Sequence, residues 1–141
     1  MISLNDIPVV IEKNYITEAP SFQVRALLEE LAELISNLVN RDEPGYIDIR
    51  SIPLMPQDVE FLKQFLGAGE VSATVDALGE TQVIETSIPA VWWIVNRNTA
   101  GEIISEFIEV ATAPEILKTQ RMDLHDAPEI LRRRMDEAGI V

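Results

Sequence analysis

Cysteine is absent from the 141 residues of the chain, and histidine occurs once. The lack of cysteine excludes disulfides, thiolate metal sites, iron–sulfur ligation and cysteine nucleophiles. It is compatible with a reducing compartment, and we expect a cytoplasmic protein. Any histidine-based triad or metal site would have to use His125, and no nucleophile motif accompanies that residue.

Long apolar runs and positive charge are also scarce. No run approaches the roughly 18 apolar residues of a membrane span, and residues 1–13 lack the basic flank of a secretory signal. Eleven Lys and Arg stand against 24 Asp and Glu, which gives a net charge of −13. Phosphates and anionic membranes repel such a chain, so we expect no nucleic-acid or membrane partner. The charge favours solubility alone or a basic protein partner.

Apolar periodicity predicts the secondary structure. Hydrophobic residues make up 47% of the chain, enough for one domain over residues 1–141 with its own core. Helical spacing predicts helices over residues 22–40, with Ser21 as N-cap, and over 56–66, with Pro56 in the first turn and Gly67 as C-cap. Alternation predicts strands over residues 7–11, 46–52, 71–77, 81–88, 91–96 and 103–110.

Short connections between these strands favour antiparallel neighbours. The predicted fold is α+β, an antiparallel β-meander of about four to five strands packed with N-terminal, central and C-terminal helices. Residues 46–110 form its expected core. In the tail, residues 111–141, the segment Ala113-Pro114-Glu115-Ile116-Leu117 recurs as Ala127-Pro128-Glu129-Ile130-Leu131. Proline followed by glutamate is typical of a helix start, so the echo predicts two short helices with His125 in the loop between them.

Three groups of residues could in principle form functional sites, but the sequence evidence for each is weak. Gly67-Ala68-Gly69 lacks the third glycine and the lysine of phosphate-binding loops, and it follows a helix, so we interpret it as a helix end and strand entry. His125 beside Asp123 and Asp126 would form a poor, open metal site. Carboxylates are so numerous that no catalytic pair stands out. We expect no resident metal, no cofactor and no catalytic residue.

Two consecutive tryptophans are the most informative physical feature. Successive strand residues point to opposite faces, so Trp93 lies with Val91 and Val95 on one face, and Trp92 lies with Ile94 on the other. Both faces of this strand are therefore apolar. Either the amphipathic helices cover one side and the tail helices the other, or one face forms a homodimer seam or a client-binding surface. We expect the core-facing tryptophan to be structural and its neighbour to lie at an interface.

Several of these residues form a pattern. The pattern begins with Leu66, Gly67, Gly69, Glu70, Val71 and Ser72, and it continues with Pro89, Val91 and Trp92. The pattern resembles the C-terminal conserved region of the HupH/HyaF family of hydrogenase expression proteins. Ala90 stands where that family usually has Gly, so we expect an ordinary backbone angle there. Trp93 stands where the family often has Arg. The chain also looks shorter than typical members, which suggests a stand-alone version of the conserved region.

The resemblance implies a role in the maturation of nickel-iron uptake hydrogenases. We expect an assembly chaperone, not an enzyme, with a hydrogenase subunit precursor as partner. Its acidity suits a basic client segment. Glu70, Trp92 and Trp93 are the expected contacts, and Gly67, Gly69 and Pro89 shape the backbone around them. The alternatives are a metallochaperone that delivers nickel through carboxylates and His125, and a small carboxylate-dependent enzyme. A homodimer is also considered.

Overall fold

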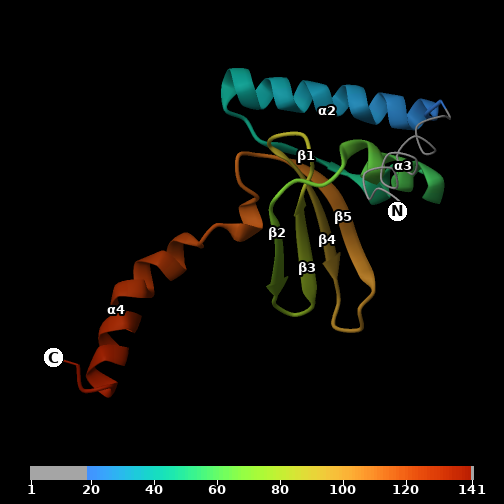
Figure 1. The fold of residues 1–141 in the computed structure, drawn as a ribbon. Coiled ribbons are helices and arrows are strands. Elements are labelled where there is room, and N and C mark those ends of the chain that lie inside the picture. The colour runs from blue at the N-terminus through green and yellow to red at the C-terminus, as the bar shows by residue number, and fades with distance from the viewer. Residues whose placement is uncertain (1–18, 141) are drawn as a thin grey trace, which may run out of the picture.

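The computed structural model describes residues 19–140, so the predicted strand over residues 7–11 lies outside the described residues. Within these residues the chain forms one sheet, two helices packed on it and a third helix that extends away from it (Figure 1). The helices are α2 (Phe22–Arg41), α3 (Pro56–Leu66) and α4 (Arg121–Glu137), and the strands are β1 (Gly45–Asp48), β2 (Ser72–Asp76), β3 (Glu80–Glu85), β4 (Val91–Arg97) and β5 (Ile103–Val110). The predicted α+β class is confirmed.

The five strands are antiparallel throughout, in the order β1-β5-β4-β3-β2. Strands β2 to β5 form the predicted meander, and β1 joins the far side of β5. The strand predicted over residues 46–52 is shorter in the structure. Strand β1 ends at Asp48, and a 3-10 turn, η1 (Ile49–Ser51), follows. The Asp48 carboxylate accepts a hydrogen bond from Arg50 N at 3.0 Å. This local bond competes with strand pairing and explains the early end.

The two packed helices begin and end as their sequences predict. The Ser21 hydroxyl accepts from Val24 N at 3.3 Å and caps α2, which closes on Asp42 in the left-handed conformation. Pro56 lies in the first turn of α3, and Gly67 caps its end with a φ of 68°. Both helices present an apolar stripe to the sheet, because residues three and four apart share one side of a helix.

Side chains alternate between the two faces of the sheet as predicted for the tryptophan pair. Val91, Trp93 and Val95 belong to the main core, which α2 and α3 complete with Leu27 and Leu62 among others. A second, smaller cluster on the opposite face contains Val83, Trp92 and Ile94, with Ala73 and Phe107 against it. The Trp92 indole N–H donates to Ala111 O at 2.9 Å, which ties the segment after β5 to this face.

The tail differs from the prediction in two ways. A 3-10 turn, η2 (Glu115–Leu117), replaces the first predicted helix, and α4 begins at Arg121 and runs through Pro128. An interior proline removes one helical hydrogen bond and destabilises a helix by about 3 kcal/mol. The helix nevertheless continues through Pro128, so the predicted helix start at Pro128 and Glu129 is wrong. No residue of α4 is buried, and the helix extends away from the sheet (Figure 1). The alternative in which tail helices cover the second face of the sheet is therefore wrong.

Between residues 19 and 140, no helix is both long and apolar enough to cross a bilayer.

Candidate functional site

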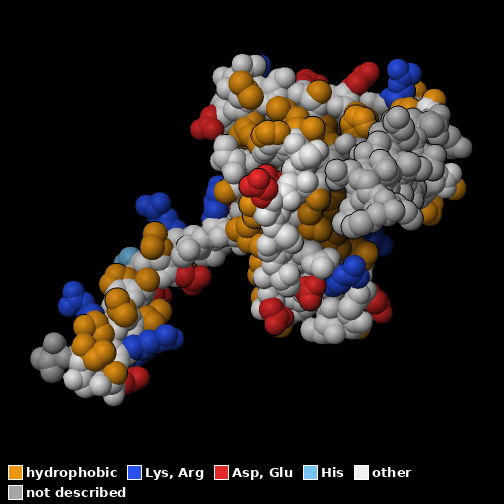
Figure 2. Space-filling model, in the orientation of Figure 1, with side chains coloured by type: hydrophobic (Ala, Val, Ile, Leu, Met, Phe, Trp, Pro, Cys, Tyr) orange, Lys and Arg blue, Asp and Glu red, His pale blue; other side chains and the backbone are white. Residues whose placement is uncertain are grey.

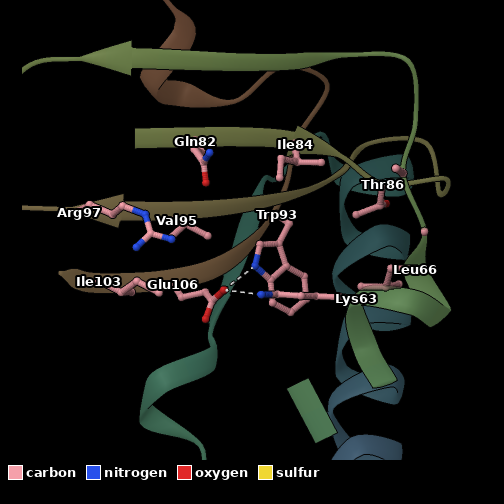
Figure 3. A pocket seen from close by; sticks show the side chains of 12 residues that line it. Lys63, Leu66, Gln82, Ile84, Thr86, Trp93, Val95, Arg97, Ile103 and Glu106 are labelled. Atoms are coloured by element: carbon pink, nitrogen blue, oxygen red, sulfur yellow. Dashed lines mark hydrogen bonds and ion pairs between the residues drawn. The ribbon is translucent and has the colours of Figure 1, made fainter. Parts of the chain in front are cut away.

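A cavity of about 360 Å³ opens on the helix-covered side of the sheet, beside the end of α3 (Figure 3). Its floor comes from side chains of β3, β4 and β5 that point to this face, and its wall comes from the last turn of α3 and the residues after it. The lining residues are Lys63, Leu66, Gly67, Ala68, Gln82, Ile84, Thr86, Trp93, Val95, Arg97, Ile103 and Glu106. A mostly apolar hollow with a few polar groups is typical of a binding site.

Glu106 is the central polar group of this cavity. Its side chain is only 10% exposed, and its Oε2 accepts a hydrogen bond from the Trp93 indole N–H at 2.8 Å. The Lys63 Nζ lies 3.4 Å from the same oxygen and 5.4 Å from the centroid of the Trp93 ring. One neutral donor and one cation thus stabilise Oε2 of the buried carboxylate, as a buried charge requires.

The second carboxylate oxygen of Glu106, Oε1, accepts no hydrogen bond from residues 19–140. Both contacts described above reach Oε2. Arg97 also lines the cavity, but its Nη1 donates to Gly101 O at 3.1 Å in its own hairpin. Apolar side chains of β3 and β4 surround this polar centre (Figure 3). The cavity can therefore hold an apolar group and offers an acceptor for one donor.

Close backbone packing positions the wall formed by residues 66–69. Ser87 N donates to Leu66 O at 2.8 Å, and Gly69 N donates to Glu85 O at 2.8 Å. A side chain at Gly69 would put its Cβ 2.7 Å from Thr86 O, closer than such atoms approach. Gly67 and Gly69 thus let the chain pass tightly over the end of β3, which places Ala68 at the cavity wall.

The predicted contact residues fall in three different places. Trp93 lines the cavity, whereas Glu70 is exposed just beyond the wall segment and does not line it. Trp92 is 8% exposed, lies on the opposite face of the sheet and uses its indole N–H internally. The structure therefore brings Trp93 to the cavity, leaves Glu70 beside it and separates Trp92 from both.

Pro89 lies in the corner between β3 and β4, and here one prediction is wrong. Ala90 has a φ of 69°, in the left-handed region, although an ordinary angle was expected. The corner is tightly bonded: Thr86 N and Thr86 Oγ1 both donate to Val91 O, at 3.0 and 2.9 Å. Ala90 O also accepts from Ala111 N at 2.9 Å. These bonds hold alanine in a conformation that glycine adopts more easily.

His125 was predicted to form only a poor, open metal site with Asp123 and Asp126. His125 lies on α4, not in a loop as predicted, and it is exposed with its Nδ1 3.3 Å from Asp126 Oδ1. Across the described part of the chain, no three His, Asp or Glu side chains converge in a way that could hold a metal ion.

Two members of the cavity were not singled out from sequence, namely Lys63 and Glu106. They are 43 residues apart, since 106 − 63 = 43, so no local motif joins them. A signal existed nonetheless: Glu106 shares a face with Ile108 and Val110, and a carboxylate on an apolar strand face is a buried polar group in need of partners.

Comparison with known proteins decides the family. The profile described as HupH hydrogenase expression protein, C-terminal conserved region, matches residues 22–138. The chain belongs to this HupH family. The resemblance read from the residues around Gly67 and Pro89 is thereby confirmed. A solved structure of the hydrogenase expression protein HupH from Thiobacillus denitrificans is similar, with a TM-score of 0.79 and 41% identity. The match covers 84% of this chain and 99% of that one.

Curated HupH relatives are more distant and longer. The hydrogenase expression/formation protein HupH of Rhizobium leguminosarum bv. viciae is 29% identical over 81% of this chain and 40% of its own length. HoxQ of Cupriavidus necator is 28% identical over 79% and 40%, respectively. The hydrogenase-1 operon protein HyaF of Escherichia coli is 26% identical over 70% and 35%. The chain thus spans less than half the length of these curated relatives.

Proposed function

We propose that this chain is an accessory protein of hydrogenase maturation that acts in the cytoplasm as an assembly chaperone, without chemistry of its own. Its membership of the HupH family and the names of its relatives, hydrogenase expression/formation proteins, support the accessory role. The proposed partner is a hydrogenase subunit precursor. The cavity at Glu106 supports a binding role, because its polar groups form one ion pair and no nucleophile–base pair.

The proposed binding mode rests on Glu106 Oε1, which accepts no hydrogen bond from residues 19–140. A basic side chain of the client can lay its aliphatic stem along the apolar lining and donate to Glu106 Oε1. Lys63 already neutralises part of the carboxylate charge, so the site favours a donor with an apolar stem over a bare cation. Glu70, exposed beside the wall, and the net charge of −13 would attract the same basic segment over a longer range.

Trp92 has no part in this proposal. Its ring is buried on the opposite face and its N–H is bonded to Ala111 O, so it stabilises the second cluster instead. Trp93 takes the contact role that the sequence assigned to the pair, because its ring forms part of the cavity lining.

The test is binding of the chain to a purified hydrogenase subunit precursor. Glu106→Gln keeps an acceptor for the Trp93 N–H but removes the charge, and we expect roughly tenfold weaker binding, the usual effect of losing one charge-assisted hydrogen bond. Binding should also weaken as salt increases, because the attraction between the acidic chain and a basic segment is screened.

Glu29→Gln is the matched control. It makes the same charge change on the exposed side of α2, away from the cavity, and binding should stay within about twofold of wild type. Equal binding by wild type and Glu106→Gln would refute the cavity as the client site. No binding to any hydrogenase subunit precursor would refute the chaperone proposal itself.

A further inference from the structure

Strand β2 forms one edge of the sheet. It pairs with β3 on one side, and among residues 19–140 no strand pairs with it on the other (Figure 1). Directly before the strand, Val71 O accepts a hydrogen bond from Glu85 N at 2.9 Å, so odd-numbered residues direct their backbone groups toward β3. This direction alternates along an antiparallel strand. The outer edge therefore presents the N–H and C=O groups of Ser72, Thr74 and Asp76, and the name "β2 edge" is used below for these groups.

The β2 edge lacks the features that usually prevent a sheet edge from pairing with another chain. Such features include Lys, Pro and β-bulges. The sequence of Ser72–Asp76 contains neither Lys nor Pro, and its five residues pair one for one with those of β3, without a bulge. At roughly 3.4 Å per residue, the edge presents its donors and acceptors over about 14 Å. It is therefore a regular template for one further strand.

The two sides of β2 differ in character. On the side of the sheet that carries the cavity, Ser72, Thr74 and Asp76 are exposed. On the other side Ala73 and Val75 are half-buried, and Ala73 packs against the second apolar cluster. A strand that pairs with the β2 edge places alternate side chains on these two sides. The geometry therefore fits a segment in which apolar residues alternate with polar or basic ones.

Charge distinguishes between possible occupants of the β2 edge. Residues 70–85 contain four acidic residues and neither Lys nor Arg. Glu70 and Asp76 are exposed near the two ends of the edge, and Asp76 lies opposite Glu80. Figure 2 shows acidic side chains at the lower end of this hairpin. A basic segment is attracted here, whereas a second copy is disfavoured, because antiparallel pairing about Thr74 would bring Asp76 of one copy near Glu70 of the other.

We infer that an extended, basic segment of the client, the hydrogenase subunit precursor, pairs with the β2 edge as a further strand of the sheet. The hydrogen bonds between the two backbones provide affinity, and the alternating side chains provide selectivity. Lys or Arg side chains of the segment lie near Glu70 and Asp76, and its apolar side chains extend the surface of Ala73 and Val75. The inference rests on the proposed function for the identity of the client.

The β2 edge and the cavity at Glu106 are separate contacts. Glu106 lies on β5, and β3 and β4 lie between β5 and β2. A strand added to β2 is four strand spacings from β5, about 19 Å at roughly 4.8 Å per spacing. No side chain of the added strand spans this distance, so a different part of the client enters the cavity. Substitutions can therefore remove either contact without the other.

A proline at the centre of the β2 edge tests the pairing. Thr74→Pro removes one outward N–H and leaves the hydrogen bonds to β3 in place, a change that edge strands tolerate. We expect the precursor to bind this variant about tenfold more weakly than wild type, as measured by calorimetry. Thr74→Val is the matched control, because it keeps the N–H and removes only the hydroxyl, and its binding should stay within about twofold.

Two further measurements do not depend on how well Thr74→Pro folds. In the wild type, the amides of Ser72, Thr74 and Asp76 should exchange rapidly and become protected when the precursor binds, as followed by NMR. Asp76→Lys should weaken binding roughly three- to tenfold at low salt, because it reverses a charge beside the basic segment. Glu29→Lys makes the same charge change on the exposed side of α2 and should have little effect.

The outcomes separate this inference from the proposed function. A precursor that binds wild type and a folded Thr74→Pro variant equally well, or that leaves the Thr74 amide unprotected, would overturn the inference and leave the chaperone role intact. Protection of the same amides in the chain alone at high concentration would assign the β2 edge to a second copy and also overturn it. A precursor that does not bind the wild type at all would overturn both.

Discussion

Two replacements of Glu106 distinguish how much its hydrogen bond from Trp93 and its ion pair with Lys63 each contribute to the free energy of unfolding. Glu106→Gln keeps an oxygen for the Trp93 indole N–H and loses only the ion pair with Lys63. That lysine side chain is 46% exposed, so the pair is screened and its loss costs about 0.5 kcal/mol. Glu106→Leu has no acceptor and leaves the N–H of a buried tryptophan unpaired, which costs about 1–3 kcal/mol in addition.

The free energy of unfolding therefore falls in the order wild type, Glu106→Gln, Glu106→Leu, with roughly 1–3 kcal/mol between the two variants. Urea unfolding followed by far-UV circular dichroism measures this difference, and equal m-values would show that the denatured states are comparable. Repeating both variants with Trp93→Phe removes the donor, and the gap between them should close. A Glu106→Leu variant as stable as Glu106→Gln in the presence of Trp93 would refute the reasoning.

Further predictions concern the core, the corner, the cavity wall and metal binding. Leu62→Ala, at a fully buried position, should lower the free energy of unfolding by about 2–5 kcal/mol. Ala90→Gly should raise it by roughly 0.5 kcal/mol, because relief of the left-handed strain exceeds the entropic cost of glycine, whereas Ala100→Gly in an exposed turn should lower it. Gly69→Ala should destabilise by about 1–3 kcal/mol through its clash with Thr86 O, and thermal denaturation measures this change. Calorimetry with nickel should show no tight stoichiometric binding, and a stoichiometric isotherm would favour the metallochaperone alternative.

Much of the fold could be predicted from local patterns. Ser21, Pro56 and Gly67 mark helix ends by their own hydrogen-bonding and backbone preferences, and the structure uses all three as predicted. The opposite faces of Trp92 and Trp93 follow from strand geometry alone. These features depend on a residue and its near neighbours in the chain.

The sequence-based predictions fail where tertiary contacts outweigh the local backbone preference of a residue, or where residues distant in the chain come together. Pro128 resembles a helix start, yet a helix that begins seven residues earlier runs through it. Ala90 is held at a positive φ by bonds from Thr86 and Ala111, which no local pattern reveals. The pairing of Lys63 with Glu106 depends on how α3 packs on the sheet, and the sequence contains no spacing rule for it.

Hydrogen–deuterium exchange of the chain, with and without a hydrogenase subunit precursor, tests the central claim most directly. The account predicts slower exchange at residues 66–69 and in β4 and β5 around Trp93 and Glu106 when the precursor is bound, with little change on the exposed side of α2. Protection confined to other surfaces, or exchange that the precursor leaves unaltered, would contradict the claim that this cavity receives the client.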